Sequence, residues 1–201
     1  MVGRYHAPVQ PLALHTDSRF MARAKGTVLL TLVKTLRANA ERSRQLLPAN
    51  LHHYLEERIV QAAWYPLEDH LAMLRILPKL FPKAGADFFV QVGRATAKEQ
   101  MSGVYGRLAG DTSRKAIGTL LAAMFDTGEM TVVERAPGRA VTDWVGFALP
   151  TREMCAIFTG YQMERMTLQG FDDVVARHSR CRAEGGTVCR WEITWKSRSK
   201  E

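Results

Sequence analysis

Three cysteines and one histidine combine residue type and spacing in a way that suits metal chemistry. Cys181 and Cys189 flank a glycine turn near the carboxyl end of the chain, and His178 precedes the first of them by three positions. If the turn lies at residues 184–186, the two cysteines stand nearly opposite each other, with Cβ atoms about 4.5 to 5.5 Å apart. Such a pair suits a tetrahedral zinc ion, with His178 as a third ligand and Cys155 as a fourth.

These cysteines have two other interpretations, a structural disulfide and buried free thiols. An odd number of cysteines in a reducing compartment argues against a structural disulfide. Buried free thiols beside a surface histidine stay open as the alternative to zinc. Strand alternation places His178 and Cys181 on opposite faces of the sheet, so the zinc interpretation requires a β-bulge between them.

Aromatic residues spread along the chain could line a pocket for a small hydrophobic or aromatic molecule. The residues that we expect to line it are Trp64, Tyr65, Tyr105, Phe125, Trp144 and Tyr161. Core packing is the alternative role for each of them. Trp191, Ile193 and Trp195 alternate along the last predicted strand, so we expect them to face the helices.

The other polar residues of note have simple structural interpretations. His52, His53 and His70 lie on predicted helices and are expected to be solvated or hydrogen-bonded there, with a haem or catalytic role as the alternative for His70. Glu68 and Asp69 follow Pro66 and would complement the helix dipole. The sequence contains no Ser-His-Asp order, P-loop, dinucleotide fingerprint or H-E-x-x-H motif, so we expect a non-enzymatic domain.

Composition agrees with a globular domain that does not span a membrane. The chain has 201 residues, 46% hydrophobic residues and a formal net charge of +8. Its basic residues are dispersed, which argues against a nucleic-acid groove. It lacks both an apolar run of about 18 residues and a secretory signal, so we expect a cytoplasmic protein.

Hydrophobic periodicity predicts a mixed fold. Helical spacing covers residues 26–47, 49–64, 67–80, 86–108, 112–125 and 150–170. Alternating segments predict two hairpins, within residues 129–147 and 172–195. We therefore predict an α+β fold in which an N-terminal helical bundle packs on a four-stranded antiparallel sheet, with a helix between the hairpins. Residues 1–20 are expected to form a flexible arm, 21–196 a single domain and 197–201 a disordered tail.

Several segments resemble a known superfamily. "CAIFTGYQMERM" and "HSRCRAEGGTVCRWEITW" are similar to the C-terminal half of the 4-vinyl-reductase domain. Its superfamily includes haem-nitric-oxide-binding domains, phenol-sensing regulator domains and TRAPP subunits. "MARAKGTVLL", "WYPLEDHLAML", "VGRATAKEQMSGVYGRL" and "FDTGEMTVVERAPGRAV" further resemble a large paralogous family of undefined function best represented in myxobacteria.

The resemblance implies a ligand-binding or signalling domain that forms a homodimer through its N-terminal helices. Some phenol-sensing relatives hold zinc at positions that match Cys155, Cys181 and Cys189, and His178 stands where those relatives have an acidic ligand. The sequence has no Tyr-x-Ser-x-Arg propionate motif, so we expect no haem. The alternatives are a TRAPP-like interaction scaffold without a ligand and an enzyme acting on a tetrapyrrole or aromatic compound.

Overall fold

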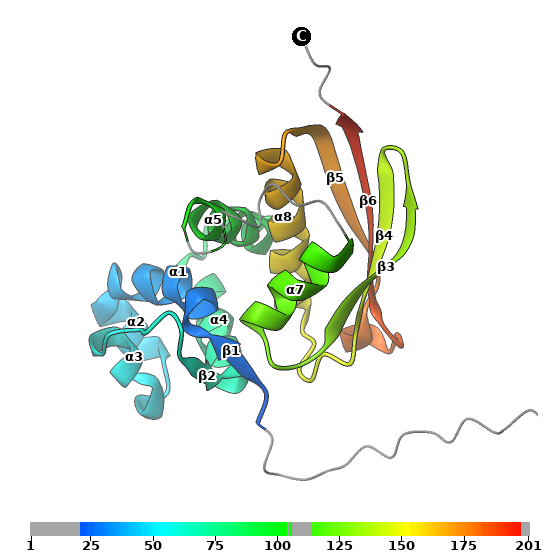
Figure 1. The fold of residues 1–201 in the computed structure, drawn as a ribbon. Helices are drawn as coiled ribbons and strands as arrows, with labels where there is room; N and C mark the ends of the chain where they lie inside the picture. The colour runs from blue at the N-terminus through cyan, green and yellow to red at the C-terminus, as the bar shows by residue number, and fades with distance from the viewer. Residues whose placement is uncertain (1–20, 104, 106–113, 198–201) are drawn as a thin grey trace, which may run out of the picture.

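Helices cover one face of a four-stranded antiparallel sheet, which confirms the predicted α+β fold (Figure 1). The computed structural model describes residues 21–103, 105 and 114–197. The predicted arm, residues 1–20, and nearly all of the predicted tail lie outside these ranges.

The elements divide into a helical layer and a sheet. The helices are α1 (Gly26–Arg37), α2 (Ala40–Leu46), η1 (Ala49–Leu51), α3 (His53–Glu56), α4 (Leu67–Leu80), α5 (Phe88–Ser102), α7 (Arg114–Met124), α8 (Arg152–Leu168) and η2 (Arg182–Glu184). The main sheet has the order β3 (Glu129–Ala136), β4 (Arg139–Val145), β6 (Cys189–Ser197) and β5 (Phe171–Arg180). A small sheet pairs β1 (Arg23–Lys25) with β2 (Trp64–Pro66).

The first predicted helix, residues 26–47, is in fact two helices. The backbone leaves helical geometry at Asn39, where φ is −127° and ψ is 40°. The side-chain amide of Asn39 donates to the Thr35 carbonyl at 3.0 Å, and the Ser43 hydroxyl donates to the Leu36 carbonyl at 2.9 Å. These side chains take carbonyls that a continuous helix would have used, so they stabilise the break.

The second predicted helix, residues 49–64, was largely wrong. Only η1 and α3 form, and Glu57 is already extended. The Arg37 guanidinium donates to the Tyr54 carbonyl at 2.8 Å and also to the Glu57 carbonyl. It thereby takes a carbonyl that the next helical turn would have needed. The chain then pairs as β2 with β1, a small sheet that the periodicity did not indicate.

The remaining helices follow the prediction with shorter ends. α4 spans the predicted residues 67–80, and α8 lies within 150–170. α5 begins at Phe88 after its N-cap Asp87 and ends at Ser102 with Gly103 as its C-cap, so the predicted residues 86, 87 and 103 lie outside it. The end predicted at residue 108 and the start of α7 predicted at residue 112 lie outside the described residues.

The inner face of the sheet forms much of the core. Trp191 and Ile193 of β6 are buried against the helices, as predicted, and Trp195 is half-buried. Trp144 of β4 packs between Phe147 and Phe158, with ring centroids 4.0 and 5.1 Å away. These large side chains hold α8 against the sheet.

α5 and α8 approach each other through two glycines. A Cβ atom added to Gly93 would lie 1.8 Å from the Ile157 carbonyl oxygen, and one added to Gly160 would lie 1.9 Å from the Val90 carbonyl oxygen. Because real Cβ contacts are never this short, only glycine permits the observed separation of the helix backbones. The small residues of this helix therefore allow close packing at Gly93, whereas Gly103 serves as a C-cap.

We predict that Gly93→Ala lowers the free energy of unfolding by about 2 kcal/mol or more, because the new methyl group meets rigid backbone. Gly118→Ala in α7 is the matched control, since its Cβ would lie 3.5 Å from the Met130 carbonyl oxygen, an ordinary contact. This control should be neutral or stabilising by up to about 1 kcal/mol, in line with helix propensity. Urea unfolding followed by circular dichroism measures both, and equal effects of the two substitutions would contradict the packing argument.

Candidate functional site

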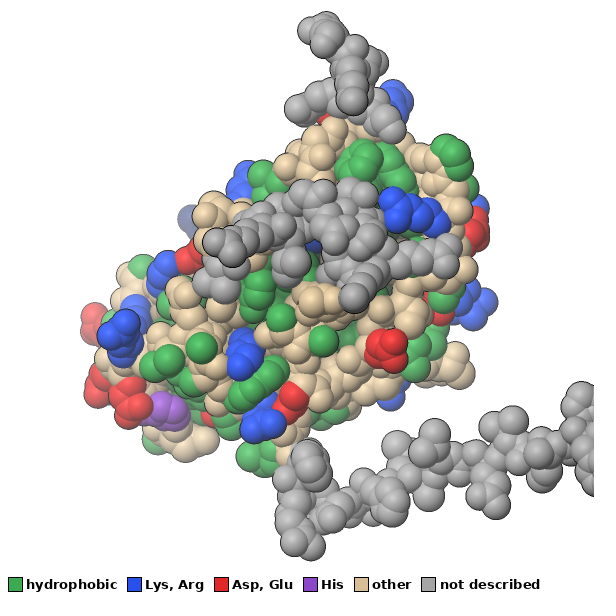
Figure 2. Space-filling view, viewed as in Figure 1, with side chains coloured by type: hydrophobic (Ala, Val, Ile, Leu, Met, Phe, Trp, Pro, Cys, Tyr) green, Lys and Arg blue, Asp and Glu red, His purple; other side chains and the backbone are tan. Residues whose placement is uncertain are grey.

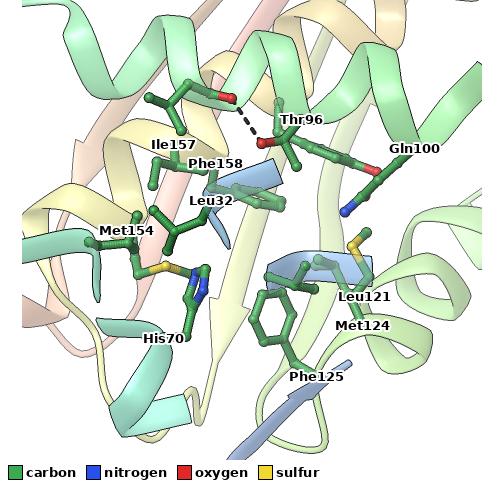
Figure 3. A pocket seen from close by; sticks show the side chains of 14 residues that line it. Leu32, His70, Thr96, Gln100, Leu121, Met124, Phe125, Met154, Ile157 and Phe158 are labelled. Atoms are coloured by element: carbon green, nitrogen blue, oxygen red, sulfur yellow. Dashed lines mark hydrogen bonds between the residues drawn. The ribbon is translucent and has the colours of Figure 1, made fainter. Parts of the chain in front are cut away.

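A mainly apolar cavity lies between the helical layer and α8 (Figure 3). Its volume is about 50 Å³. Five helices and the residue that follows α7 contribute its walls. The lining residues are Val28, Leu32, His70, Leu74, Val92, Thr96, Gln100, Leu121, Met124, Phe125, Met154, Ile157, Phe158 and Tyr161.

His70 brings an imidazole to this apolar cavity. Its side chain points into the space from α4 (Figure 3), the residue is 4% exposed, and its Nδ1 has no hydrogen-bond partner. Burial lowers the pKa of His70 to about 4, so the ring is neutral at pH 7. The expectation of a solvated or hydrogen-bonded histidine was therefore wrong for His70. It holds for His52 and His53, whose ring nitrogens lie 3.2 and 2.9 Å from backbone carbonyl oxygens.

Two more polar atoms at the cavity lack partners. Gln100 donates from Nε2 to the Thr27 carbonyl at 3.0 Å, which leaves its Oε1 buried and unpaired. The Tyr161 hydroxyl is also buried without a partner, and burial raises its pKa well above the usual range, so it stays a neutral phenol. A buried polar group without a hydrogen bond costs about 1 to 3 kcal/mol. Three such groups around one cavity are the polar features expected of a ligand site.

The structure brings only some of the predicted pocket aromatics together. Phe125 and Tyr161 line the cavity. Tyr105 lies nearby, but its hydroxyl is 3.1 Å from the Thr27 hydroxyl. Trp144 belongs to the core cluster under the sheet.

Trp64 and Tyr65 lie on β2, away from the cavity lining. The Lys25 ammonium sits 4.0 Å from the centre of the Trp64 ring, and the Tyr65 hydroxyl accepts from the Val60 amide at 2.9 Å. Sequence reasoning favoured a solvated or hydrogen-bonded His70 over a haem or catalytic role, and it missed Gln100. A signal for His70 was present, because it lies three residues after Leu67 and four before Leu74 and so shares their apolar face.

The predicted metal ligands form a second compact site. One ligand atom from each of Cys155, His178, Cys181 and Cys189 lies within 4.8 Å of the others. The Cys155 Sγ atom is 3.9 Å from that of Cys181 and 3.7 Å from that of Cys189. All three cysteines are buried and reduced. Zinc–sulfur bonds of about 2.3 Å in a tetrahedron separate two sulfur atoms by about 3.8 Å, so the spacing matches a zinc site.

A β-bulge turns His178 toward the cysteines. The pairing register of β5 with β6 shifts between His178 and Arg180, which is the irregularity that the sequence argument required. The His178 ring stacks on Trp191 with centroids 4.6 Å apart, and its Nε2 is buried without a hydrogen-bond partner. Trp191 is held in turn by its indole N–H, which donates to the Thr159 hydroxyl at 2.9 Å.

The pKa values of two of the thiols are shifted in opposite directions. The Cys155 thiol donates to Cys189 Sγ, which lowers the pKa of the Cys189 thiol and raises that of Cys155. The Arg182 amide also donates to Cys189 Sγ, at 3.4 Å. Both hydrogen bonds favour the thiolate form of Cys189, which is the form that binds metal.

The visible surface carries mixed charge. On the face shown in Figure 2, basic side chains are interspersed with acidic and apolar ones, and the described residues there form no continuous basic patch. Among the described helices, none has both the length and the apolar character needed to cross a membrane.

Comparison with known proteins finds similarity at the level of structure. No family model and no curated protein sequence matches the chain. An unliganded Fe(II) H-NOX protein variant from K. algicida has a TM-score of 0.60 at 10% identity, over 87% of this chain and 98% of that one. An oxygen-binding H-NOX domain related to soluble guanylate cyclases has a TM-score of 0.58 at 14% identity, over 88% and 97% of the two chains.

The chain has the H-NOX fold. A third similar structure is an H-NOX protein from S. oneidensis in the Fe(II)NO state, with a TM-score of 0.58 and 11% identity over 86% and 99% of the two chains. At these identities the likeness shows the fold alone. It agrees with the haem-nitric-oxide-binding superfamily that the sequence segments resemble.

The expectation of no haem has to be corrected. It rested on the missing propionate motif, but proteins described by their iron ligation states or by haem distortion share this fold along nearly their whole length. The absence of this motif does not exclude haem, because other proteins with the same fold are described by their haem or its iron. The buried imidazole of His70, whose Nδ1 has no hydrogen-bond partner among the described residues, also offers an iron ligand outside that motif.

We predict that His70 makes folding pH-dependent. Its pKa is about 4 in the folded protein against 6.5 for an exposed histidine, so the unfolded chain binds more protons between these values. The free energy of unfolding therefore decreases as the pH is lowered through this window, by about 3 kcal/mol in total. Urea unfolding between pH 7.5 and 4.5 should show a shallower pH dependence for His70→Leu than for wild type, while His53→Gln should follow wild type. Parallel curves for wild type and His70→Leu would contradict a buried neutral imidazole.

Proposed function

We propose that this chain is a small-molecule-binding sensor domain whose ligand occupies the cavity lined by His70, Gln100 and Tyr161. The observation that carries the proposal is the set of three buried polar atoms without partners around otherwise apolar walls. A ligand with an apolar body and a few polar atoms would satisfy all three and remove their energetic cost. Figure 3 shows His70 and Gln100 directed toward the same space from opposite helices.

Haem is the first ligand to test at this site. A neutral histidine ring can ligate haem iron, and His70 lies among the apolar side chains that a porphyrin requires. A cavity of about 50 Å³ holds only a few waters, so haem binding would need the lining to move apart. Met124 and Met154 supply adaptable side chains in the lining for this movement. When bound, the iron would offer a coordination site for a diatomic gas.

The residues of the chain would have separate roles around such a ligand. His70 would bind the metal or, for another ligand, accept or donate one hydrogen bond. Gln100 Oε1 would accept a hydrogen bond, and the Tyr161 hydroxyl would donate one. The apolar residues would exclude water, which strengthens each of these contacts.

We further propose a structural zinc ion held by Cys155, His178, Cys181 and Cys189. The sulfur separations and the unpartnered His178 Nε2 support a Cys₃His shell. The ion would connect α8 to both strands of the terminal hairpin. It would thereby fix the helix that supplies four residues of the ligand cavity.

Other interpretations of the sequence remain predictions. They are the myxobacterial paralogous family, its link to 4-vinyl-reductase domains and a homodimer formed by the N-terminal helices. The interaction scaffold differs from the sensor in needing no ligand, so native mass spectrometry of purified protein separates the two. An enzyme acting on a tetrapyrrole would in addition require a redox cofactor in the same spectrum.

The haem test is a titration followed by absorbance. We expect wild type to bind about one haem per chain with the spectrum of a histidine-ligated iron, because His70 is the imidazole in the cavity. His70→Gly should weaken binding at least 10-fold, and about 10 mM imidazole should restore the spectrum by occupying the vacated space. His52→Gln, outside the cavity, is the matched control.

Two outcomes would count against this assignment. Unchanged binding by His70→Gly would remove His70 from the site. Absence of binding by wild type would exclude haem, and absence of any co-purified small molecule in native mass spectra would then overturn the sensor function as well.

The zinc test is a metal analysis of untagged protein. We expect close to one zinc per chain in wild type and its loss in Cys189→Ser, with a lower melting temperature because metal binding is coupled to folding. His53→Gln removes a histidine outside the cluster and should keep the metal. Zinc-free wild type after growth with added zinc would contradict the proposal and leave three buried thiols.

A further inference from the structure

Arg165 is a buried cation without a counter-ion. It lies on α8 and is 4% exposed. Burial lowers its pKa to about 10, so it still carries its charge at pH 7. Within residues 21–103, 105 and 114–197, no carboxylate lies at ion-pair distance from it. An uncompensated buried charge is costly, and charged residues are rarely fully buried unless they are paired.

The guanidinium makes two hydrogen bonds to described residues. Its Nε donates to Gln162 Oε1 and its Nη1 to Gln169 Oε1, both at 3.2 Å. A guanidinium has five N–H groups, so these two neutral amides satisfy fewer than half of them. The two amides are neutral, so they do not compensate the positive charge of Arg165. The neighbouring acid, Glu164, pairs with Arg94 and Lys98 of α5 instead.

Arg165 also lines a second cavity, separate from the one that contains His70. This cavity of about 30 Å³ lies between α8 and the sheet, and it shares no lining residue with the first. Thr142 of β4 lines its sheet side, is 0% exposed, and has a hydroxyl without a hydrogen-bond partner. Val132, Ala140 and Ile193 are among the apolar residues of that side, and Arg135 of β3 is a second basic residue in the lining. A buried cation and an unpartnered buried hydroxyl therefore line the same small space.

We propose that this cavity is an anion site that takes a small carboxylate, held by the Arg165 guanidinium and the Thr142 hydroxyl. A carboxylate is planar and accepts two parallel hydrogen bonds from a guanidinium. A volume of about 30 Å³ admits a group of two or three water volumes, which matches formate or acetate and excludes a bulky acid. Binding would neutralise the buried charge, so occupancy would stabilise the contact of α8 with the sheet.

The test compares acetate with gluconate, which carries the same carboxylate on a body too large for the cavity. Melting temperature is measured at pH 7 and constant ionic strength while sodium acetate replaces sodium gluconate. We expect the melting temperature of wild type to rise with the logarithm of the acetate concentration above its Kd, by about 5 to 10 °C once acetate exceeds the Kd about 100-fold. Arg165→Met should fold, because it replaces an unpaired buried charge with an apolar side chain of similar length, and should lose the response.

A second variant keeps the result interpretable if Arg165→Met does not fold. Thr142→Val keeps the shape and the arginine but removes one hydrogen bond, so the acetate Kd should rise about 3- to 10-fold. His70→Leu should respond to acetate as wild type does, which separates this site from the first cavity. Equal melting curves in acetate and gluconate for wild type, or an unchanged response in both Arg165→Met and Thr142→Val, would overturn the proposal.

Discussion

The contact between α5 and α8 at Gly93 and Gly160 is the constraint on which the candidate sites depend. Each glycine faces a backbone carbonyl of the other helix, at Ile157 and Val90, so the contact is reciprocal and leaves no room for a side chain. It sets the distance between two walls of the ligand cavity, since Gln100 belongs to α5 and Tyr161 to α8. A change of even one methyl group there would move both polar atoms relative to His70.

α8 connects three sites that differ in chemistry. Cys155 near its start lies in the thiol cluster, Tyr161 in its middle lines the ligand cavity, and Arg165 near its end lines the anion cavity. The helix can do this because it lies between α5 and the sheet, so that polar residues such as Gln162 are buried along with apolar ones. A metal ion at one end and an anion at the other would each act on the helix that forms a wall of the ligand cavity. This arrangement gives the proposed sensor a physical means of coupling its sites.

The buried polar atoms without partners carry more functional information than the aromatic residues do. Most of the aromatics pack against one another in the core, as Phe158 does against Trp191, whose indole N–H donates to the Thr159 hydroxyl. His70, Gln100, Tyr161 and Thr142 instead hold polar atoms away from both water and partners. Natural proteins keep few such atoms, and each one calls for an explanation such as a ligand. The H-NOX fold alone names no ligand for this chain, so the identity of any ligand depends on these particular side chains.

The sequence by itself determined most of the element types, the four-stranded sheet and the thiol cluster. These depend on local periodicity and on cysteines in a hairpin, and a hairpin brings its two sides together through its own turn. Tertiary structure decided the break at Asn39, the early end of α3 and the β1–β2 pair, because distant side chains and strands compete there with helix propensity. It also decided the roles of His70 and Arg165. A histidine on an apolar helix face or an arginine on a central helix is a candidate ligand-binding residue only when it is buried without a hydrogen-bond or ion-pair partner. Only the tertiary structure shows which neighbours surround it.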